Sequence, residues 1–191
     1  MELQNIYDKS FEKINFTTEP FARAEYERCI FNNCNFSGIN FSGCEFMECE
    51  FTGCDLSMVK LGKTGFKDVT FKDCKMLGMR FDHCNEFGLV VRFEGCVVNY
   101  SSFYGLKLKK TIFKSTQLHS ADFTDCDLSA AVFDGCDLTD AKFENTVLEK
   151  TDFRTAFNFS IDPAINRIKK ARFSLPGLAG LLEKYDLEIT P

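Results

Sequence analysis

The chain repeats its apolar positions with a period of five residues over most of its length. Every fifth residue from Phe11 to Phe81 is apolar, and after a shift of two residues a second series runs from Phe93 to Phe153. Phe and Leu alternate strictly in the second series from Phe103 onward. The residue two positions before each of these centres is small or aliphatic, whereas the other three positions of each five-residue unit are mostly polar.

A period of five matches neither an α-helix nor a flat strand. It matches a chain that turns a corner every five residues and directs two side chains of each unit inward and three outward. Gly, Asn or Asp often lies two residues after a centre, and these residue types tolerate the positive φ of a corner. Four sides close a square, so residues 20 apart stack in successive coils about 4.8 Å apart. The pattern predicts about seven coils and a rod of roughly 34 Å.

The composition follows from the same pattern. The 191 residues include 22 Phe, 10 Cys and no Trp. Eighteen of the phenylalanines occupy the centres, and all ten cysteines occupy the small position two residues earlier. A core slot that recurs every five residues suits Phe, whereas Trp is larger and carries an N–H group that needs a partner. We expect one domain whose interior is filled by side chains and leaves no room for a substrate.

The residues that could carry chemistry do not form a site in the sequence. A zinc site would need C-x-x-C pairs, which are missing, and a catalytic cysteine would need an exposed setting near a histidine. His83 and His119 fall on outward positions, whereas the cysteines point inward as small hydrophobic residues. We therefore expect no catalytic, cofactor-binding or metal-binding residues, and we predict that the protein is not an enzyme.

The start of the chain carries neither the basic segment nor the apolar segment of a secretory signal. No stretch approaches 18 consecutive apolar residues, the minimum for a membrane-spanning helix. We therefore expect a cytoplasmic protein that does not contact a membrane and whose thiols stay reduced.

Three five-residue strings resemble the A(D/N)LXX motif of pentapeptide-repeat proteins: Cys49–Gly53 (CEFTG), Ala121–Asp125 (ADFTD) and Cys136–Asp140 (CDLTD). The resemblance covers about residues 11–157. It implies an all-β fold, a right-handed quadrilateral parallel β-helix, and the handedness comes from the resemblance alone. We divide the chain into an N-terminal cap (1–10), the β-helix of about seven coils (11–157) and a C-terminal capping and dimerisation module (158–191).

The shift between the two series places a two-residue insertion within residues 83–92. Glu86 falls where the first series expects an apolar centre, so Phe87 or Leu89 is expected to replace it. The insertion is either a local bulge at a corner or a small contact loop with Glu86 or Arg92 at its tip. The candidate bulge residues are Glu86, Phe87 and Arg92.

The segment from Ser174 to Tyr185 predicts a short C-terminal α-helix with Ser174 as N-cap and Pro176 in its first turn. An apolar stripe at helical spacing is expected to cover the last coil, because the end of a β-helix exposes apolar surface and unpaired strand edges. The resemblance implies that such a module also forms a homodimer. The candidate cap and dimer surface comprises Leu178, Leu181, Leu182, Tyr185, Leu187 and Ile189.

Charge changes sign in blocks along the chain, which becomes bands along a stacked rod. Residues 1–59 carry a net charge of −6, residues 60–114 +6, residues 115–153 −7 and residues 154–191 +2, for −5 overall. The block 115–153 is read either as ordinary solvated surface or as a negative surface for a basic partner. We call its nine carboxylates the acidic band: Asp122, Asp125, Asp127, Asp134, Asp137, Asp140, Glu144, Glu149 and Asp152.

The resemblance extends to the quinolone-resistance (Qnr-type) branch of the family, without its long loops. That branch implies a dimeric rod that mimics the size and charge of duplex DNA and binds type II topoisomerases, DNA gyrase or topoisomerase IV. The first hypothesis is therefore a protein-binding rod of this kind, which does not itself bind nucleic acid. The alternative is a passive scaffold or interaction module with an unrelated partner, for which the basic block around Lys107, Lys109, Lys110 and Lys114 would be the contact surface.

Overall fold

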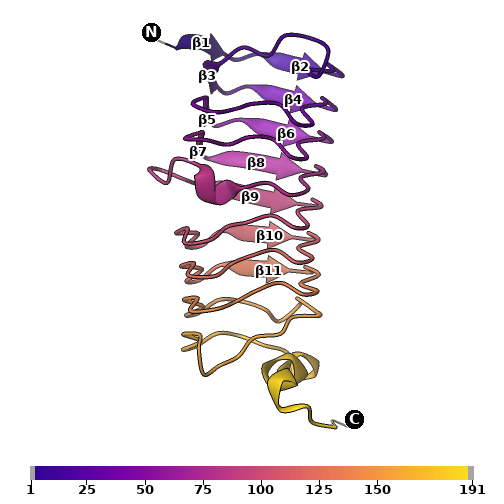
Figure 1. Ribbon diagram of the computed structural model, residues 1–191, viewed down its shortest axis with the longest axis vertical. Coiled ribbons are helices and arrows are strands. Elements are labelled where there is room, and N and C mark those ends of the chain that lie inside the picture. The colour runs from indigo at the N-terminus through magenta and orange to yellow at the C-terminus, as the bar shows by residue number, and fades with distance from the viewer. Residues whose placement is uncertain (1–2, 189–191) are drawn as a thin grey trace.

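Successive coils of the chain stack on one another through parallel backbone pairing (Figure 1). The computed structural model describes residues 3–188. A residue generally pairs with the residue 20 positions later, as in Phe31 with Phe51 and Ile112 with Val132. This register confirms the predicted all-β parallel solenoid of about seven turns. The right-handed sense of the coil stays a prediction.

Two sides of the rod contain regular strands. The first side is a four-stranded sheet, made of β1 (Gln4–Tyr7), β3 (Ala24–Glu27), β5 (Glu45–Met47) and β7 (Gly65–Lys67). The second side is a seven-stranded sheet, made of β2 (Ser10–Glu12), β4 (Ile30–Asn32), β6 (Glu50–Thr52), β8 (Val69–Lys72), β9 (Val91–Glu94), β10 (Ile112–Lys114) and β11 (Val132–Asp134).

The other two sides are held by isolated parallel bridges. The third side begins with the column Asn15, Asn35, Asp55 and Lys75, and the fourth side contains Asn40 paired with Lys60 and the column Arg80, Ser102, Asp122 and Lys142. Bridges also continue the first side to Arg167 and the second side to Arg172. Backbone pairing therefore extends from Gln4 to Arg172, and the domain boundaries at 10/11 and 157/158 stay predictions.

The centres of the five-residue units form the core. Aromatic rings in the same column are stacked, with centroids 4.8 Å apart for Phe113 and Phe133 and 4.6 Å apart for Phe31 and Phe51. Rings from neighbouring sides meet edge to face, as Phe113 and Phe123 do at 5.9 Å and 83°. Both geometries are favourable for aromatic pairs, so the repeated Phe supplies packing in two directions.

The small position before each centre also serves the backbone. All ten cysteines are free and buried. The thiol of Cys54 donates to the carbonyl of Phe31 at 3.2 Å, and the hydroxyl of Thr64 donates to the carbonyl of Phe41 at 2.8 Å. Each acceptor is the centre of a unit in the preceding coil, so Cys and Thr satisfy a buried carbonyl while filling a small space.

The two-residue insertion forms a projecting loop between the 3-10 helix η1 (Phe81–His83) and β9 (Figure 1). Val69 pairs with Val91, so the register is offset by 22 residues at this level alone. Leu89 packs against the core and replaces the expected centre, whereas Phe87 is 80% exposed. Glu86 is exposed in the loop, but Arg92 is not at its tip, because it lies in β9 and forms an ion pair with Asp68.

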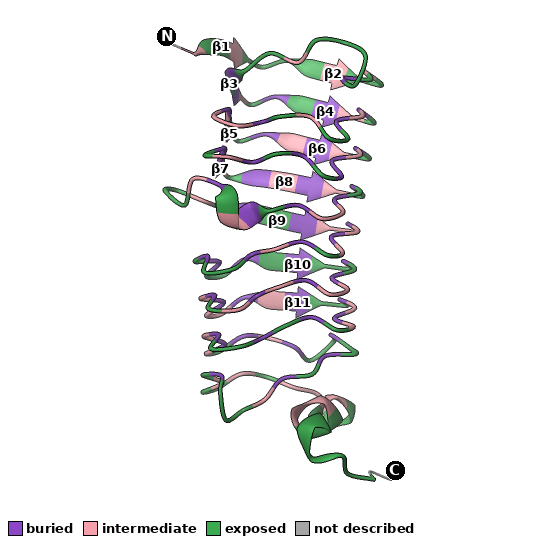
Figure 2. Ribbon diagram, in the orientation of Figure 1, coloured by how far each residue is buried: buried purple, intermediate pink, exposed green. Residues whose placement is uncertain are grey.

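The prediction of an α-helix in the C-terminal segment was wrong. The segment forms two 3-10 helices, η2 (Pro176–Leu181) and η3 (Glu183–Tyr185), and neither contains a buried residue (Figure 2). Pro and two glycines within six residues disfavour a continuous α-helix. Ser174 does form a hydrogen bond at the start of η2, since its hydroxyl accepts the N–H of Gly177 at 3.2 Å. No helix among the described residues is long and apolar enough to cross a membrane.

Candidate functional site

The acidic band surrounds the rod. Its nine carboxylates are distributed over all four sides of consecutive coils. Asp127 and Glu149 lie on the first side, Asp134 and Asp152 on the second, Asp137 and Asp140 on the third and its corner, and Asp122, Asp125 and Glu144 on the fourth. Figure 1 places this block in the half of the rod that precedes the C-terminal helices. The band therefore presents negative charge in every direction around the axis.

Ion pairs neutralise part of the band. Asp127 lies 3.1 Å from Lys109, Glu149 lies 2.8 Å from Arg167, and Asp152 lies 2.7 Å from Arg154. Lys109 and Arg167 come from neighbouring coils, so these two contacts also connect successive coils, whereas Arg154 lies in the same unit as Asp152. These ion pairs reduce the negative potential that a partner would meet on the first and second sides. The net charge counted over residues 115–153 does not include this effect.

Asp137 forms hydrogen bonds with three other residues of the third side. Its oxygens accept the hydroxyl of Thr139 at 2.7 Å and the side-chain amide of Asn158 at 3.0 Å, and His119 Nε2 lies at 2.8 Å. Partial burial acts to raise the pKa of Asp137, but the hydrogen bonds from Thr139, His119 and Asn158 outweigh it and lower the pKa to about 2. Asp137 therefore connects several side chains of the third side through hydrogen bonds.

The fourth side holds the carboxylates that are most available. Asp125 and Glu144 are exposed and Asp122 is partly exposed, and within residues 3–188 none of the three forms an ion pair. A hydrogen bond with Asp125 raises the pKa of the half-exposed Tyr104 above its ordinary value. This side therefore holds three carboxylates that no cation among the described residues pairs with.

Most cations of the basic block 60–114 are paired. Lys114 lies 2.6 Å from Glu94, Lys72 lies 2.9 Å from Glu50, and Lys109 contacts Asp127 of the acidic band. Four exposed lysines of this block form no ion pair with the described part of the chain: Lys60, Lys63, Lys107 and Lys110. The contact surface of the alternative hypothesis is thus reduced to Lys107 and Lys110 on the first side.

The C-terminal segment covers the last coil differently from the expectation. Of the predicted stripe only Leu181 packs against the core, whereas Leu178, Leu182 and Tyr185 are 38–58% exposed. Contact is made instead through the backbone, because the carbonyl of Gly180 accepts the N–H of Ile161 at 2.9 Å. Leu187 is also exposed, and Ile189 lies outside the described residues. An apolar surface consequently remains uncovered at this end of the rod.

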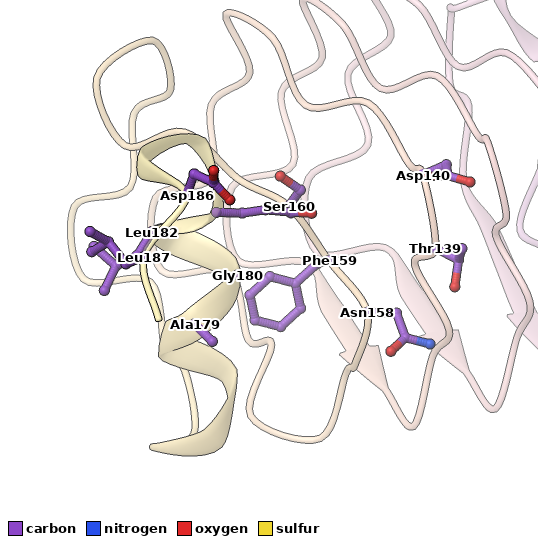
Figure 3. Close-up of a pocket in the computed structure, with 11 residues that line it drawn as sticks. Thr139, Asp140, Asn158, Phe159, Ser160, Ala179, Gly180, Leu182, Asp186 and Leu187 are labelled. Carbon is purple, nitrogen blue, oxygen red and sulfur yellow. The ribbon is translucent and has the colours of Figure 1, made fainter. Parts of the chain in front are cut away.

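A groove lies between this segment and the last coils (Figure 3). Its volume is about 710 Å³. The ring of Phe159 lies against η2 beside Gly180, and Asp140, Ser160 and Asp186 line the groove from different segments (Figure 3). The lining combines apolar surface with hydroxyl and carboxylate side chains.

All ten cysteines are buried, and three of them show clearly what burial does to a thiol. Burial raises the pKa of the thiols of Cys49, Cys126 and Cys136 to about 12. Reactive thiols have lowered pKa values and exposed, electropositive surroundings, which these positions do not have. Among residues 3–188, no group of three or more His, Cys, Asp or Glu side chains is arranged to hold a metal ion.

Comparisons with known proteins address the fold. A model described as a pentapeptide repeat region matches residues 44–123, and a model of eight pentapeptide repeats matches residues 116–155. No curated protein matches the chain. Two trypsin-treated variants of QnrB1, described as a plasmid-mediated fluoroquinolone resistance protein, are similar to it with TM-scores of 0.63 and 0.61. Each is 16% identical, and the first match covers 100% of both chains and the second 99% of both. Full-length QnrB1 has a TM-score of 0.51 at 16% identity, over 96% of this chain and 100% of its own.

Proposed function

Because the chain belongs to the pentapeptide-repeat family, we propose that it is a non-enzymatic, protein-binding rod that mimics duplex DNA and modulates a type II topoisomerase. The partner would be DNA gyrase or topoisomerase IV, and the biological outcome would be fluoroquinolone resistance. Similarity to the fold of QnrB1, itself a fluoroquinolone resistance protein, supports this choice of partner.

The acidic band is the observation that carries the proposal. Residues 115–153 hold a net charge of −7. They occupy about two coils, or roughly 10 Å of rod at the spacing of stacked strands. Duplex DNA carries about six charges over the same length. The block therefore carries about as many negative charges as duplex DNA of the same length. They are available to a partner chiefly on the third and fourth sides, because Lys109, Arg167 and Arg154 pair with the carboxylates of the first and second sides.

Dimerisation through the C-terminal module belongs to the same proposal. Leu178, Leu182, Tyr185 and Leu187 form an exposed apolar surface at the end of the rod. Two copies joined there would place an acidic band on either side of the centre and double the length of the mimic. A cytoplasmic location also follows, since a topoisomerase partner is found there and the ten buried cysteines are free.

A supercoiling assay with purified gyrase tests the proposal. We expect the protein to inhibit supercoiling, or to protect gyrase from a fluoroquinolone, at micromolar concentration. Reversing the fourth-side carboxylates (Asp122→Lys, Asp125→Lys and Glu144→Lys) is expected to abolish the effect, whereas the matched reversal Lys107→Glu, Lys110→Glu on the first side retains it. No binding, no inhibition and no protection by the parent protein would refute the topoisomerase role.

The alternative is a scaffold that contacts an acidic partner through the first side. Lys107 and Lys110, exposed and without ion pairs in residues 3–188, favour it. Under this alternative the Lys107→Glu, Lys110→Glu variant, rather than the carboxylate reversal, loses its partner in a pull-down. The same two variants therefore separate the two functions.

A further inference from the structure

The fourth side of the rod carries opposite charges in its two halves. Its N-terminal half holds Arg23, Lys60, Lys63 and Arg80 and two carboxylates, the exposed Glu19 at the first coil and Asp82, which pairs with Arg80 at 2.6 Å. Its C-terminal half holds the unpaired Asp122, Asp125 and Glu144, with Lys142 as the sole cation. Apart from the Arg80–Asp82 pair, these charges form no ion pairs among the described residues.

This side also carries small residues between its charged ones. Its outward positions include Ser42, Gly43, Gly62, Ser102 and Gly105. A Cβ added at Gly105 would meet no atom within 4 Å, and the guanidinium of Arg23 lies over Gly43. Small residues beside Lys60, Lys63, Asp122 and Asp125 allow side chains of a second surface to reach these charges, and Tyr104 is a large side chain that projects among them.

We propose that the fourth side binds the fourth side of a second copy of this chain, with the two rods antiparallel. A two-fold axis in the interface, perpendicular to the rods, places each column of residues opposite the same column of the partner. With the axis midway between the coils of Arg80 and Ser102, Lys60 faces Asp122 of the partner subunit and Lys63 faces Asp125 of the partner subunit.

The remaining charges agree with this register. Lys142 faces the partner's Asn40, Glu144 faces the partner's Ser42, and Tyr104 faces the partner's Asp82. No two like charges are opposite one another, and each favourable pair occurs twice because the interface is isologous. Charge complementarity therefore selects a second copy, in one orientation and one register.

The strength of the association follows from the size of the surface. The facing surface extends over six coils along the rod and about four residues across it, which is about 29 Å by 13 Å. The dimer therefore buries roughly 800 Å² counted over both rods. Stable interfaces bury about 1,200 Å² or more, so this dimer is weak and depends on its ion pairs. It forms at high protein concentration and low ionic strength, and salt dissociates it. The inference does not depend on the proposed function.

Sedimentation of the full chain tests it. The substitutions Leu178→Asp and Leu182→Asp are kept in every sample so that association through the C-terminal end does not contribute. We expect a concentration-dependent dimer at about 20 mM salt and a monomer at about 500 mM, where the screening length falls to a few ångströms. A monomer at both ionic strengths, at protein concentrations up to about 1 mM, refutes the proposal.

Charge exchange identifies the interface. Lys60→Glu, Lys63→Glu and, separately, Asp122→Lys, Asp125→Lys are each expected to abolish the dimer at low salt. A mixture of these two variants forms a heterodimer, and the chain with all four substitutions dimerises again, because every facing pair is again opposite in charge. The control Lys107→Glu, Lys110→Glu leaves the dimer intact.

Failure of the mixture to restore the dimer would overturn the antiparallel register. A parent protein that remains monomeric but binds a 20-base-pair duplex, with loss of binding in Lys60→Glu, Lys63→Glu, would instead make the N-terminal half of this side a polyanion-binding surface. Circular dichroism of each variant confirms that the exposed substitutions leave the fold unchanged.

Discussion

Position within the five-residue unit decides what a side chain does in this protein, and phenylalanine shows this directly. Phe113 is fully buried and stacks on Phe93 and Phe133 with interplanar angles of 2°. Phe87 is 80% exposed, because the two-residue insertion removes it from the series of centres. Two residues of the same type therefore contribute very differently to stability.

Phe113→Ala is expected to lower the free energy of unfolding by about 3–5 kcal/mol, because it leaves a cavity between two stacked rings. Phe87→Ala, the matched control, should change it by less than about 0.5 kcal/mol. Guanidinium denaturation of both variants measures the difference. Equal effects would contradict the assignment of Phe87 to the loop surface and Phe113 to the core.

Asp137→Asn is expected to destabilise the protein in a pH-dependent way. Because the pKa of Asp137 is lowered to about 2, its ionised form stabilises the fold at pH values above the unfolded-state pKa. That contribution is lost as the pH falls from about 4 to about 2. We expect a loss of about 1–2 kcal/mol at pH 7, after allowance for solvent screening, and almost none at pH 2.

Denaturation of the parent and Asp137→Asn proteins at pH 7 and pH 2 provides this measurement. Asp140→Asn is the control, because Asp140 is exposed and forms no ion pair within the described residues. A destabilisation by Asp137→Asn that is the same at both pH values would show that its hydrogen bonds, rather than its charge, are what matters.

At the scale of the element, the corner is the unit that the chain repeats. The residue two positions after a centre adopts a positive φ at many corners, with Gly38 at 71° and Ala130 at 58°. Only glycine adopts this conformation without steric cost, so each non-glycine corner is maintained by the pairing of the coils around it.

Gly38→Ala and Ala130→Gly are expected to change stability in opposite directions. A Cβ at Gly38 meets no atom within 4 Å, so its cost of about 1 kcal/mol is purely conformational. Ala130→Gly relieves the same strain and should stabilise by up to about 1 kcal/mol, less the entropy that glycine adds to the unfolded chain. Thermal unfolding of both variants checks the signs. If both destabilised, unfolded-state entropy would dominate at the corners.

The C-terminal segment is held by close backbone approach. A Cβ added at Gly180 would lie 2.2 Å from the carbonyl oxygen of Phe159, which cannot move aside as a side chain would. Gly180→Ala is therefore expected to detach residues 176–186 from the last coil and raise their cleavage rate by about tenfold or more in limited proteolysis. Ala179→Ser is the control, since Ala179 is exposed. Unchanged proteolysis of Gly180→Ala would contradict this packing.

At the scale of the whole molecule, the rod has a charged fourth side along its length and an exposed apolar surface at its C-terminal end. Leu178→Asp, Leu182→Asp is expected to convert the proposed C-terminal dimer into a monomer, measured by light scattering at about 150 mM salt, where the side-by-side association is screened. Phe87→Asp, an equally polar change at a distant exposed site, should leave the dimer unchanged. A parent protein that is already monomeric at this ionic strength would remove the longer DNA mimic from the proposed function.

Much of this architecture could be predicted from the spacing of residues, because a period of five allows few solutions once inward and outward positions are assigned. The four sides, the buried cysteines and the two-residue insertion were all predicted. The sequence did not decide whether Phe87 or Leu89 fills the core position that the repeat assigns to Glu86, since both are apolar. Only the path of the loop directs Leu89 to the core. The α-helix from 174 to 185 was predicted from apolar spacing, which cannot detect that Gly180 contacts the backbone of Phe159.

The sequence by itself determined which residues lie inside, because burial of one large and one small side chain per unit repeats along the chain without reference to distant contacts. It also determined the total charge of each band. Only the tertiary structure decided which charges are free. Ion pairs form between coils, so Asp127 is neutralised by Lys109, whereas Asp125 and Lys63 remain available on the fourth side. Function on a filled rod depends on that outer surface, where neighbours come from residues about 20 positions apart.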